Sequence, residues 1–498
     1  MRLRWSPVVA WAGAAALAGA ALHRLLPVVR AQTLAPFDLI SEGPHMSTVK
    51  AIWRGFDIYA RQSFLDLPFF MTPYTPLYHA LVAVLPQDPA NPFFTGRIVA
   101  TLFMALAAAT LVVVAARGHR ATAVLALGVF FLIHAVTGNT AYFRSDAMAL
   151  CFSVWAVVVA ARADTRRRVV VAGVLAALAI AAKQSFLAAG VACFLHVAIT
   201  RPRDLPAFLL SGVAVGVLLA AAATAYFGTD FWFAVTIPLS DYPRDIGSYW
   251  VHIDMMRAQP LVRFTLGAGL VATVVGLVRP DRRRLATPYL VYALVSWGLQ
   301  NGVMTGVGAE NHNLIEPMLA TLLWIVVAVQ DDRAPLRIGW LYAAGLAALA
   351  VAATLELRNP DASLWSYTDS ERTARYVRER AAATAAMEQL GVVHGRMLNL
   401  KNSQIPHDFP GGDMTLNDVW MYITVLWNTR PETVDRLVAA LDGERFDAVI
   451  TAPGVVTAAH DSTDTPWGRI VHALFAHYRV AYHGGEVNVL VRQSQPAG

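Results

Sequence analysis

The chain has 498 residues, of which 56% are hydrophobic and only 15% are charged. Soluble domains carry about a quarter charged residues, so this composition predicts an integral membrane protein. The formal net charge of +6 argues against a nucleic-acid partner here, because the basic residues form short clusters between apolar runs, as in positively charged cytoplasmic loops.

Eleven apolar runs within the first 355 residues predict a mainly α, polytopic transmembrane helix bundle. Residues 6–29 follow Arg2 and Arg4; this run is longer than the ~7–15 apolar residues of a signal peptide, so we predict an uncleaved first helix. The later runs are 96–116, 121–138, 147–161, 169–182, 186–199, 206–227, 260–278, 286–303, 314–329 and 338–355. Several are shorter than the ~20 residues of a straight crossing, which leaves the count open by one or two. Cys151 and Cys193 lie inside these runs and are predicted to be packed thiols without a disulfide.

Every second connection between these runs is basic, which predicts the topology. The basic connections are 117–120, 162–168, 201–204, 279–284 and 333–337. A cytoplasmic N-terminus places all of them in the cytoplasm, as the positive-inside rule requires. The other connections, 30–95, 139–146, 183–185, 228–259 and 304–313, are then extracytoplasmic.

The composition changes near residue 356, where charged residues become frequent. We therefore divide the chain into a transmembrane domain, 1–355, and an extracytoplasmic α/β domain, 356–498. Residues 371–390 and 431–442 have helical periodicity, and residues 396–400 and 447–451 are predicted strands. The alternating residues on both sides of Gly484 and Gly485 predict a β-hairpin.

The first outer connection carries two acids directly after the first helix, Asp38 and Glu42. A carboxylate near a membrane surface, partly removed from water, is suited to accept a proton from a hydroxyl group. If this stretch enters a helix, the i, i+4 spacing places both acids on one face. Solvated loop acids are the alternative.

The second and third outer connections carry charges next to apolar helices. Arg144 lies in so short a loop that it needs an anionic partner, and a phosphate would serve. Asp146 precedes an apolar run, where it is either an N-cap or a site residue. Lys183, followed by Gln184, lies in a three-residue connection. A charge there costs free energy unless it is paired or faces a polar cavity. The alternative for Lys183 is a side chain that snorkels to the surface.

The last outer connection holds a cluster of acids and amides. It contains Glu310, Asn311, His312 and Asn313, and Glu316 follows. Glu310, His312 and Glu316 have metal-ligand side chains, but their spacing matches no strong signature, and the sequence requires no cofactor. A divalent cation therefore has no support from the sequence.

Taken in order, these segments resemble the multi-pass C-type (GT-C) membrane glycosyltransferases. The resemblance rests on the acidic first loop followed by TPLYHAL, on FRSDAMAL, on AAKQS, and on the Asn/Glu cluster before a late helix, and it spans most of residues 30–320. It implies a polyprenyl-phosphate sugar donor that enters from the outer leaflet, and inverting transfer to a lipid, glycan or protein acceptor. It implies Glu42 as the catalytic base, with Asp38 second; Ser41 stands where the family often has another acid.

The resemblance also implies which residues bind the donor phosphate or sugar: Arg144, Asp146, Lys183, Gln184, Asn311, His312, Asn313 and Glu316. It implies a location in the plasma (inner) membrane.

Three other classes of protein fit parts of the sequence. A transporter or flippase of lipid-linked sugars would bury charges at mid-membrane and show two similar halves, whereas here the notable charges lie in outer connections and no repeat is evident. An envelope acyl or phosphoglycerol transferase would also keep its residues outside. A sensor would need far fewer spans to anchor its extracytoplasmic domain. Enzyme is the favoured interpretation.

Overall fold

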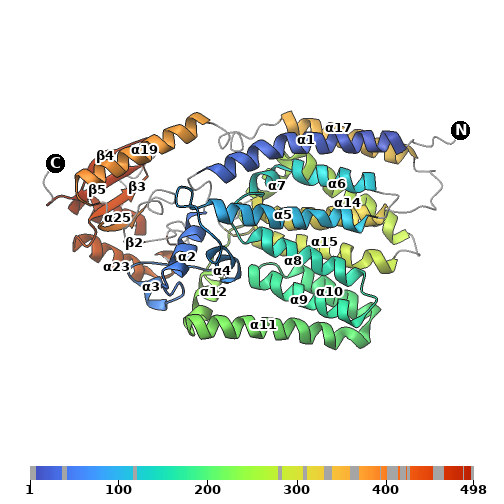
Figure 1. The fold of residues 1–498 in the computed structure, drawn as a ribbon, viewed down its shortest axis with the longest axis horizontal. Helices are drawn as coiled ribbons and strands as arrows, with labels where there is room; N and C mark the ends of the chain where they lie inside the picture. The colour runs from blue at the N-terminus through green and yellow to red at the C-terminus, as the bar shows by residue number, and fades with distance from the viewer. Residues whose placement is uncertain are drawn as a thin grey trace. The chain divides into compact units, whose positions relative to one another are not determined.

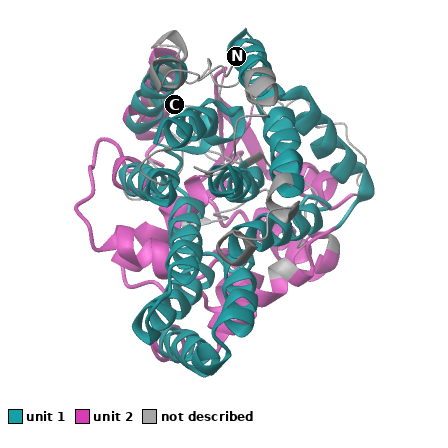
Figure 2. Cartoon of the chain, turned by 90° about the vertical axis from the view of Figure 1, so that its right-hand side faces the viewer, with its two compact units in different colours: residues 1–33, 97–220, 244–368 teal, residues 34–96, 221–243, 369–498 magenta. Residues whose placement is uncertain are grey.

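A computed structural model gives the fold (Figure 1). It describes residues 7–35, 42–115, 120–278, 283–306, 311–329, 339–358, 370–392, 394–400, 413–415, 422, 427–452, 465–485 and 487–494. The chain forms two compact units, and each contains several separate stretches of sequence (Figure 2). Unit 1 holds residues 1–33, 97–220 and 244–368; unit 2 holds residues 34–96, 221–243 and 369–498.

The described residues of unit 1 are mainly helical, and most described residues of each of the eleven predicted apolar runs lie in helices; the run 121–138 is divided between two helices. These helices are α1 (Pro7–Leu34), α5 (Phe94–Val114), α6 (Arg120–Leu132), α7 (His134–Asn139), α8 (Asp146–Ala161), α9 (Arg166–Ala182), α10 (Ala188–Thr200), α11 (Leu205–Phe227), α14 (Pro260–Val278), α15 (Arg283–Val303), α16 (Ile315–Ala328) and α17 (Gly339–Arg358). The structure adds α13 (Ile246–Ala258), inside a stretch that we treated as a connection. As predicted, Cys151 and Cys193 are buried free thiols.

Three described helical segments are long and apolar enough to cross a membrane: Trp11–Leu34, Phe94–Val114 and Pro202–Phe227. Other apolar helices, such as Asp146–Ala161 and Ala188–Thr200, are shorter than a straight crossing of about 20 residues. The count of eleven spans is therefore not confirmed.

Buried hydrogen bonds fix the positions of several helices of unit 1, because apolar packing alone is not directional. The fully buried Arg97 of α5 donates from Nη1 to the carbonyl of Gln32 at 2.7 Å, and Gln32 donates from Nε2 to the carbonyl of Gly138 at 2.7 Å. Glu356 of α17 accepts from the backbone N–H of His134 and of Leu261. The first two bonds join α1 to α5 and to α7. The two bonds of Glu356 join α17 to α7 and to α14.

Residues 42–95 of the first connection belong to unit 2. They contain α2 (Gly43–Trp53), α3 (Arg61–Leu65) and α4 (Leu77–Ala83). A further helix of unit 2, α12 (Asp230–Ser240), follows α11. Tyr59 packs edge-on against Phe227 and Phe231, which joins the loop to the helices that flank residue 228.

The C-terminal part of unit 2 is an α/β fold, as predicted. A five-stranded sheet has the order β2-β1-β3-β5-β4, with strands β1 (Arg396–Asn399), β2 (Asp413–Thr415), β3 (Ala448–Thr451), β4 (Tyr478–His483) and β5 (Asn488–Arg492). β1 is parallel to β2 and β3, and β5 is antiparallel to β3 and β4. The helices are α19 (Ser370–Gln389), α23 (Pro431–Asp442) and α25 (Pro466–His477). The predicted helices, strands and hairpin are present; β2 and α25 had no prediction.

One hydrophobic core contains residues of both the first outer connection and the C-terminal domain. Phe64, Phe69 and Met71 belong to the same buried cluster as Leu437 of α23 and Leu490 of β5. Polar contacts support this packing. The hydroxyl of Tyr422 donates to the carbonyl of Phe64 at 2.8 Å, and Arg436 pairs with Asp66 at 3.4 Å.

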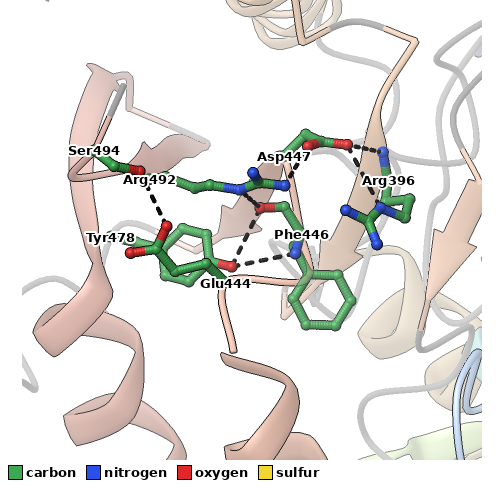
Figure 3. A network of polar contacts seen from close by, with 7 residues as sticks. All are labelled: Arg396, Glu444, Phe446, Asp447, Tyr478, Arg492 and Ser494. Carbon is green, nitrogen blue, oxygen red and sulfur yellow. Dashed lines mark hydrogen bonds and ion pairs between the residues drawn. The ribbon is translucent and has the colours of Figure 1, made fainter. Parts of the chain in front are cut away.

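A polar network lies at the end of the sheet where β3 begins and β5 ends (Figure 3). The hydroxyl of Tyr478 donates to the carbonyl of Phe446 and accepts from its N–H, both at 3.2 Å. Arg492 pairs with Asp447 and donates to the Phe446 carbonyl, and Asp447 accepts from the Arg396 N–H. These bonds tie β5 and the start of β4 to the entry of β3.

Candidate active site

The local fold brings Arg144 and Asp146 together at the start of α8. α7 ends at Asn139, and a short turn leads to α8, whose first residue is Asp146. Ser145 occupies the N-cap position, so the N-cap interpretation of Asp146 is wrong. A carboxylate in the first turn still interacts favourably with the positive end of the helix dipole.

Four predicted site residues from three of the connections form one cluster in unit 1. Lys183 Nζ lies 2.6 Å from Asp146 Oδ1. Arg144 Nη1 lies 2.9 Å from His312 Nδ1, and His312 Nε2 lies 3.9 Å from Asp146 Oδ1. Lys183 is therefore paired in the cluster instead of snorkelling to the surface.

The cluster is shielded from water and combines two cationic side chains with one carboxylate. The side chains of Lys183, Asp146 and His312 are 12%, 13% and 14% exposed. Burial alone would raise the pKa of Asp146, but Lys183, His312 and Arg144 outweigh it and hold that pKa below its usual value. Two cations, Lys183 and Arg144, therefore face one carboxylate, and such an arrangement can accept a further anion.

The remaining predicted donor residues are not all in this cluster. Gln184 and Asn313 are half-buried next to cluster residues in sequence. Glu316 is buried, and its Oε1 accepts from the hydroxyl of Tyr292 at 3.0 Å, inside the helices of unit 1. The side chain of Asn311 and all of Glu310 lie outside the described residues. Tyr292 was not predicted, since a tyrosine in an apolar run gives no sequence signal.

The predicted base, Glu42, lies at the start of α2 in unit 2. It is the N-cap residue, but its side chain makes no capping hydrogen bond, and the residue is fully buried. Its carbonyl accepts from the N–H of Met46 at 2.9 Å, so the helical turn begins at Glu42 itself. Asp38 lies outside the described residues. Solvated loop acid is the wrong interpretation for Glu42, because the residue is removed from water.

Hydrogen bonds hold α2 against the segment before α4. Thr48 Oγ1 lies 2.9 Å from Thr72 Oγ1, and the hydroxyl of Tyr59 donates to the carbonyl of Tyr74 at 2.6 Å. The hydroxyl of Tyr78 donates to the carbonyl of Gly96 at 2.9 Å. Of these bonds, the contact between Thr48 and Thr72 anchors α2 itself, and the other two fix the segments that follow it.

A buried pair of histidines lies beside this element and was not predicted. His45 Nδ1 lies 2.8 Å from His79 Nε2, and the ring of His45 stacks on that of Tyr74. Burial lowers the pKa of His79 to about 4, so this imidazole is neutral at neutral pH. The two residues are 34 positions apart, and no local spacing in the sequence indicates that they meet.

The described residues contain no group of three or more His, Cys, Asp or Glu side chains that could hold a metal ion. Of the possible metal ligands Glu310, His312 and Glu316, Glu310 lies outside the described residues.

The fold is similar to that of two solved structures of ArnT, which confirms the resemblance at the level of the fold alone. The chain is similar to ArnT from Cupriavidus metallidurans bound to undecaprenyl phosphate: 12% identity, TM-score 0.57, with 96% of this chain and 99% of that chain covered. It is similar also to the apo state of that protein, at 12% identity and TM-score 0.56, covering 94% and 96%. No protein-family model and no curated protein matches the sequence.

Proposed function

We propose that the chain is an integral-membrane glycosyltransferase that moves a sugar from a polyprenyl-phosphate donor to an envelope acceptor, with inversion, on the extracytoplasmic side. The observation that carries this proposal is the convergence of Arg144, Lys183 and His312 around Asp146. A lipid phosphate is an anionic headgroup at the membrane interface, and this cluster has the charge to bind it. The undecaprenyl phosphate bound to ArnT, a protein of the same fold, supports the class of donor.

In the proposed reaction, Glu42 is the general base. The acceptor hydroxyl loses its proton to the Glu42 carboxylate, and its oxygen forms a bond to the anomeric carbon of the sugar. The bond from that carbon to the phosphate oxygen breaks, and the electron pair leaves with the lipid phosphate. Lys183 and Arg144 stabilise the charge that develops on the leaving phosphate. No metal ion is required by these steps.

A transporter is not favoured by the likeness to ArnT. A flippase needs two alternating openings around a central site, whereas the cluster described here consists of residues from outer connections.

Purified protein is expected to transfer sugar from one member of a panel of polyprenyl-phosphate sugars. Glu42→Gln keeps the shape of the side chain but removes the base, so we expect turnover to fall about 10²- to 10⁴-fold. The measurement is product formation, with and without exhaustive chelation of divalent cations.

The matched control is Glu388→Gln, an exposed glutamate of α19, which should leave turnover unchanged. Full turnover in Glu42→Gln would remove Glu42 from the mechanism. Movement of lipid-linked sugar across a proteoliposome membrane without consumption of donor would establish the transporter instead. Activity that disappears on chelation would show that a cation takes part.

A further inference from the structure

Unit 2 exposes four large aromatic side chains from two separate stretches of sequence. Trp53, at the end of α2, is 61% exposed, and Phe56 is 36% exposed. Tyr226, in the last turn of α11, is 70% exposed, and Trp232 of α12 is 48% exposed. We call these four side chains the aromatic face. An exposed apolar patch of this kind marks a surface that binds a protein or a membrane.

One buried hydrophobic cluster of unit 2 supports the aromatic face. Three of its side chains pack edge-on against members of that cluster: Phe56 against Phe70, Tyr226 against Phe227, and Trp232 against Phe231. Ile52, the neighbour of Trp53 in the sequence, packs against the same cluster. The two stretches therefore meet, and their exposed aromatic residues belong to one surface of unit 2.

The helix α11 indicates what covers this surface. Pro202–Phe227 is one of three described segments that are long and apolar enough to cross a membrane, and only 11% of its 18-residue apolar window is buried within the protein. Other apolar side chains along this helix, such as Leu210 and Leu218, are exposed. So much apolar surface is stable against hydrocarbon and unfavourable in water. Because Tyr226 belongs to α11, the aromatic face continues a surface that faces lipid.

Polar groups beside the aromatic face indicate its depth in the membrane. Arg54 and Asp57 lie on either side of Phe56 in the sequence, and both are exposed. The indole Nε1–H of Trp232 donates to Thr224 Oγ1 at 3.0 Å. Charged side chains are costly in the hydrocarbon but not among headgroups, whereas tryptophan and tyrosine are enriched where headgroups and acyl chains meet. These neighbours favour the headgroup layer.

We infer that the aromatic face of unit 2 binds lipid at the membrane interface. A second copy of the chain or a soluble partner would not require the face to continue from a lipid-facing helix. The contact attaches α2 and the start of α12 to the membrane surface, in addition to the attachment that α11 provides. It does not depend on the proposed reaction.

Spin labels at two positions of the face test the inference in the full-length protein in lipid vesicles. Trp53→Cys and Trp232→Cys each introduce one exposed thiol, and the native Cys151 and Cys193 are buried. The accessibility of the attached nitroxide to oxygen, which is more soluble in lipid, is compared with its accessibility to a water-soluble nickel complex. We expect accessibility to oxygen to be the greater at both positions. Glu388→Cys, at an exposed position of α19, is the control and should show the opposite order.

Two results would overturn the inference. Greater accessibility to nickel at positions 53 and 232 would show that the face contacts water. Low accessibility to both reagents would show that protein covers it.

A measurement with conservative substitutions does not depend on the labelled variants. Vesicles whose lipids carry bromine near the headgroups should quench less of the tryptophan fluorescence in the double variant Trp53→Phe/Trp232→Phe than in the wild type. An equal quenched fraction would contradict lipid contact at both tryptophans. Absence of sugar transfer by the wild-type protein would overturn the proposed function and leave both of these measurements unchanged.

Discussion

Asp146 is an internal anion that interacts with the cationic side chains of the cluster. Its 2.6 Å contact with Lys183 neutralises one positive charge, and Arg144, on the other side of His312, supplies the second. A donor phosphate would share Lys183 with Asp146. Because the pKa of Asp146 is held below its usual value, the carboxylate is charged at neutral pH.

Removing one cation should weaken donor binding more than it weakens the fold. We expect Arg144→Met to raise the KM for the polyprenyl-phosphate donor about 10- to 100-fold, because a charged hydrogen bond contributes about 1.5–3 kcal/mol. Lys183→Met should do the same, although it also leaves Asp146 without its closest cation. The measurement is initial rate against donor concentration, with thermal unfolding of each variant.

The control is Arg168→Met, which breaks an exposed ion pair with Asp164 at the start of α9. Such pairs contribute about 0–1 kcal/mol, so this variant should keep the wild-type KM. An unchanged donor KM in Arg144→Met would remove Arg144 from the donor site.

His79 should make unit 2 sensitive to acid. Its pKa is lowered to about 4 by burial, below the usual value near 6.5. Between these two values the unfolded chain binds a proton that the folded chain does not, so stability is complete above pH 6.5 and is lost as the pH falls toward 4. We expect the melting temperature to fall across this window, and the curve of His79→Gln to be flatter. A wild-type curve with no slope there would contradict the burial of a neutral imidazole.

The site residues that could be predicted are charged residues next to apolar helices, because the free-energy cost of an unpaired charge there can be read from the neighbouring sequence. Lys183 in a three-residue connection and Arg144 in a short one were singled out because charge next to apolar helices needs a partner, and the structure pairs both with other predicted residues. The partners themselves could not be assigned, since Lys183 and Asp146 are 37 residues apart. The histidine pair was missed for the same reason.

Some helices and strands follow from the periodicity of their own sequence, and others do not. The hairpin of β4 and β5 and the helices α19 and α23 follow from alternation and helical period, and they were predicted. α12 and α13 were missed, because they are short and lie in a stretch that we treated as a connection. α13 nevertheless has a recognisable start, since Asp245 accepts from the N–H groups of Gly247 and Ser248 as an N-cap.

The packing of α3 against the C-terminal domain predicts a mutational effect at a distance in sequence. Phe64 is 1% exposed in the core that also holds Leu437 and Leu490. We expect Phe64→Ala to destabilise unit 2 by about 3–5 kcal/mol, as for other buried phenylalanines. Hydrogen exchange of α23 and β5, measured by mass spectrometry, should become faster.

The comparison for this experiment is Phe103→Ala in α5 of unit 1, where Phe103 packs edge-on against Phe152. It should leave exchange in α23 and β5 unchanged. If Phe64→Ala also leaves that exchange unchanged, the shared core does not contribute to the stability of the C-terminal domain.

For the whole molecule, the order of basic and acidic connections predicts one orientation in the membrane. Reporter fusions after residues 118, 165 and 498 should be cytoplasmic, cytoplasmic and extracytoplasmic, because positively charged connections stay inside. Activity of a reporter that works only in the cytoplasm, fused after residue 498, would contradict this topology. The general architecture was predictable from composition and hydropathy, whereas the joining of residues 34–96 with the C-terminal domain in one unit was not.

The core shared by residues 64–71 and the C-terminal domain sets the order in which unit 2 can fold during synthesis. Tyr422 and Phe64 are 358 residues apart, so at a synthesis rate of about 5–20 residues per second the loop that carries Glu42 waits roughly 20–70 s for its core partners. During that interval Phe64 and Phe69 lack the side chains that bury them. A growing chain therefore cannot complete the core around the segment that follows Glu42 until the C-terminal domain has been made.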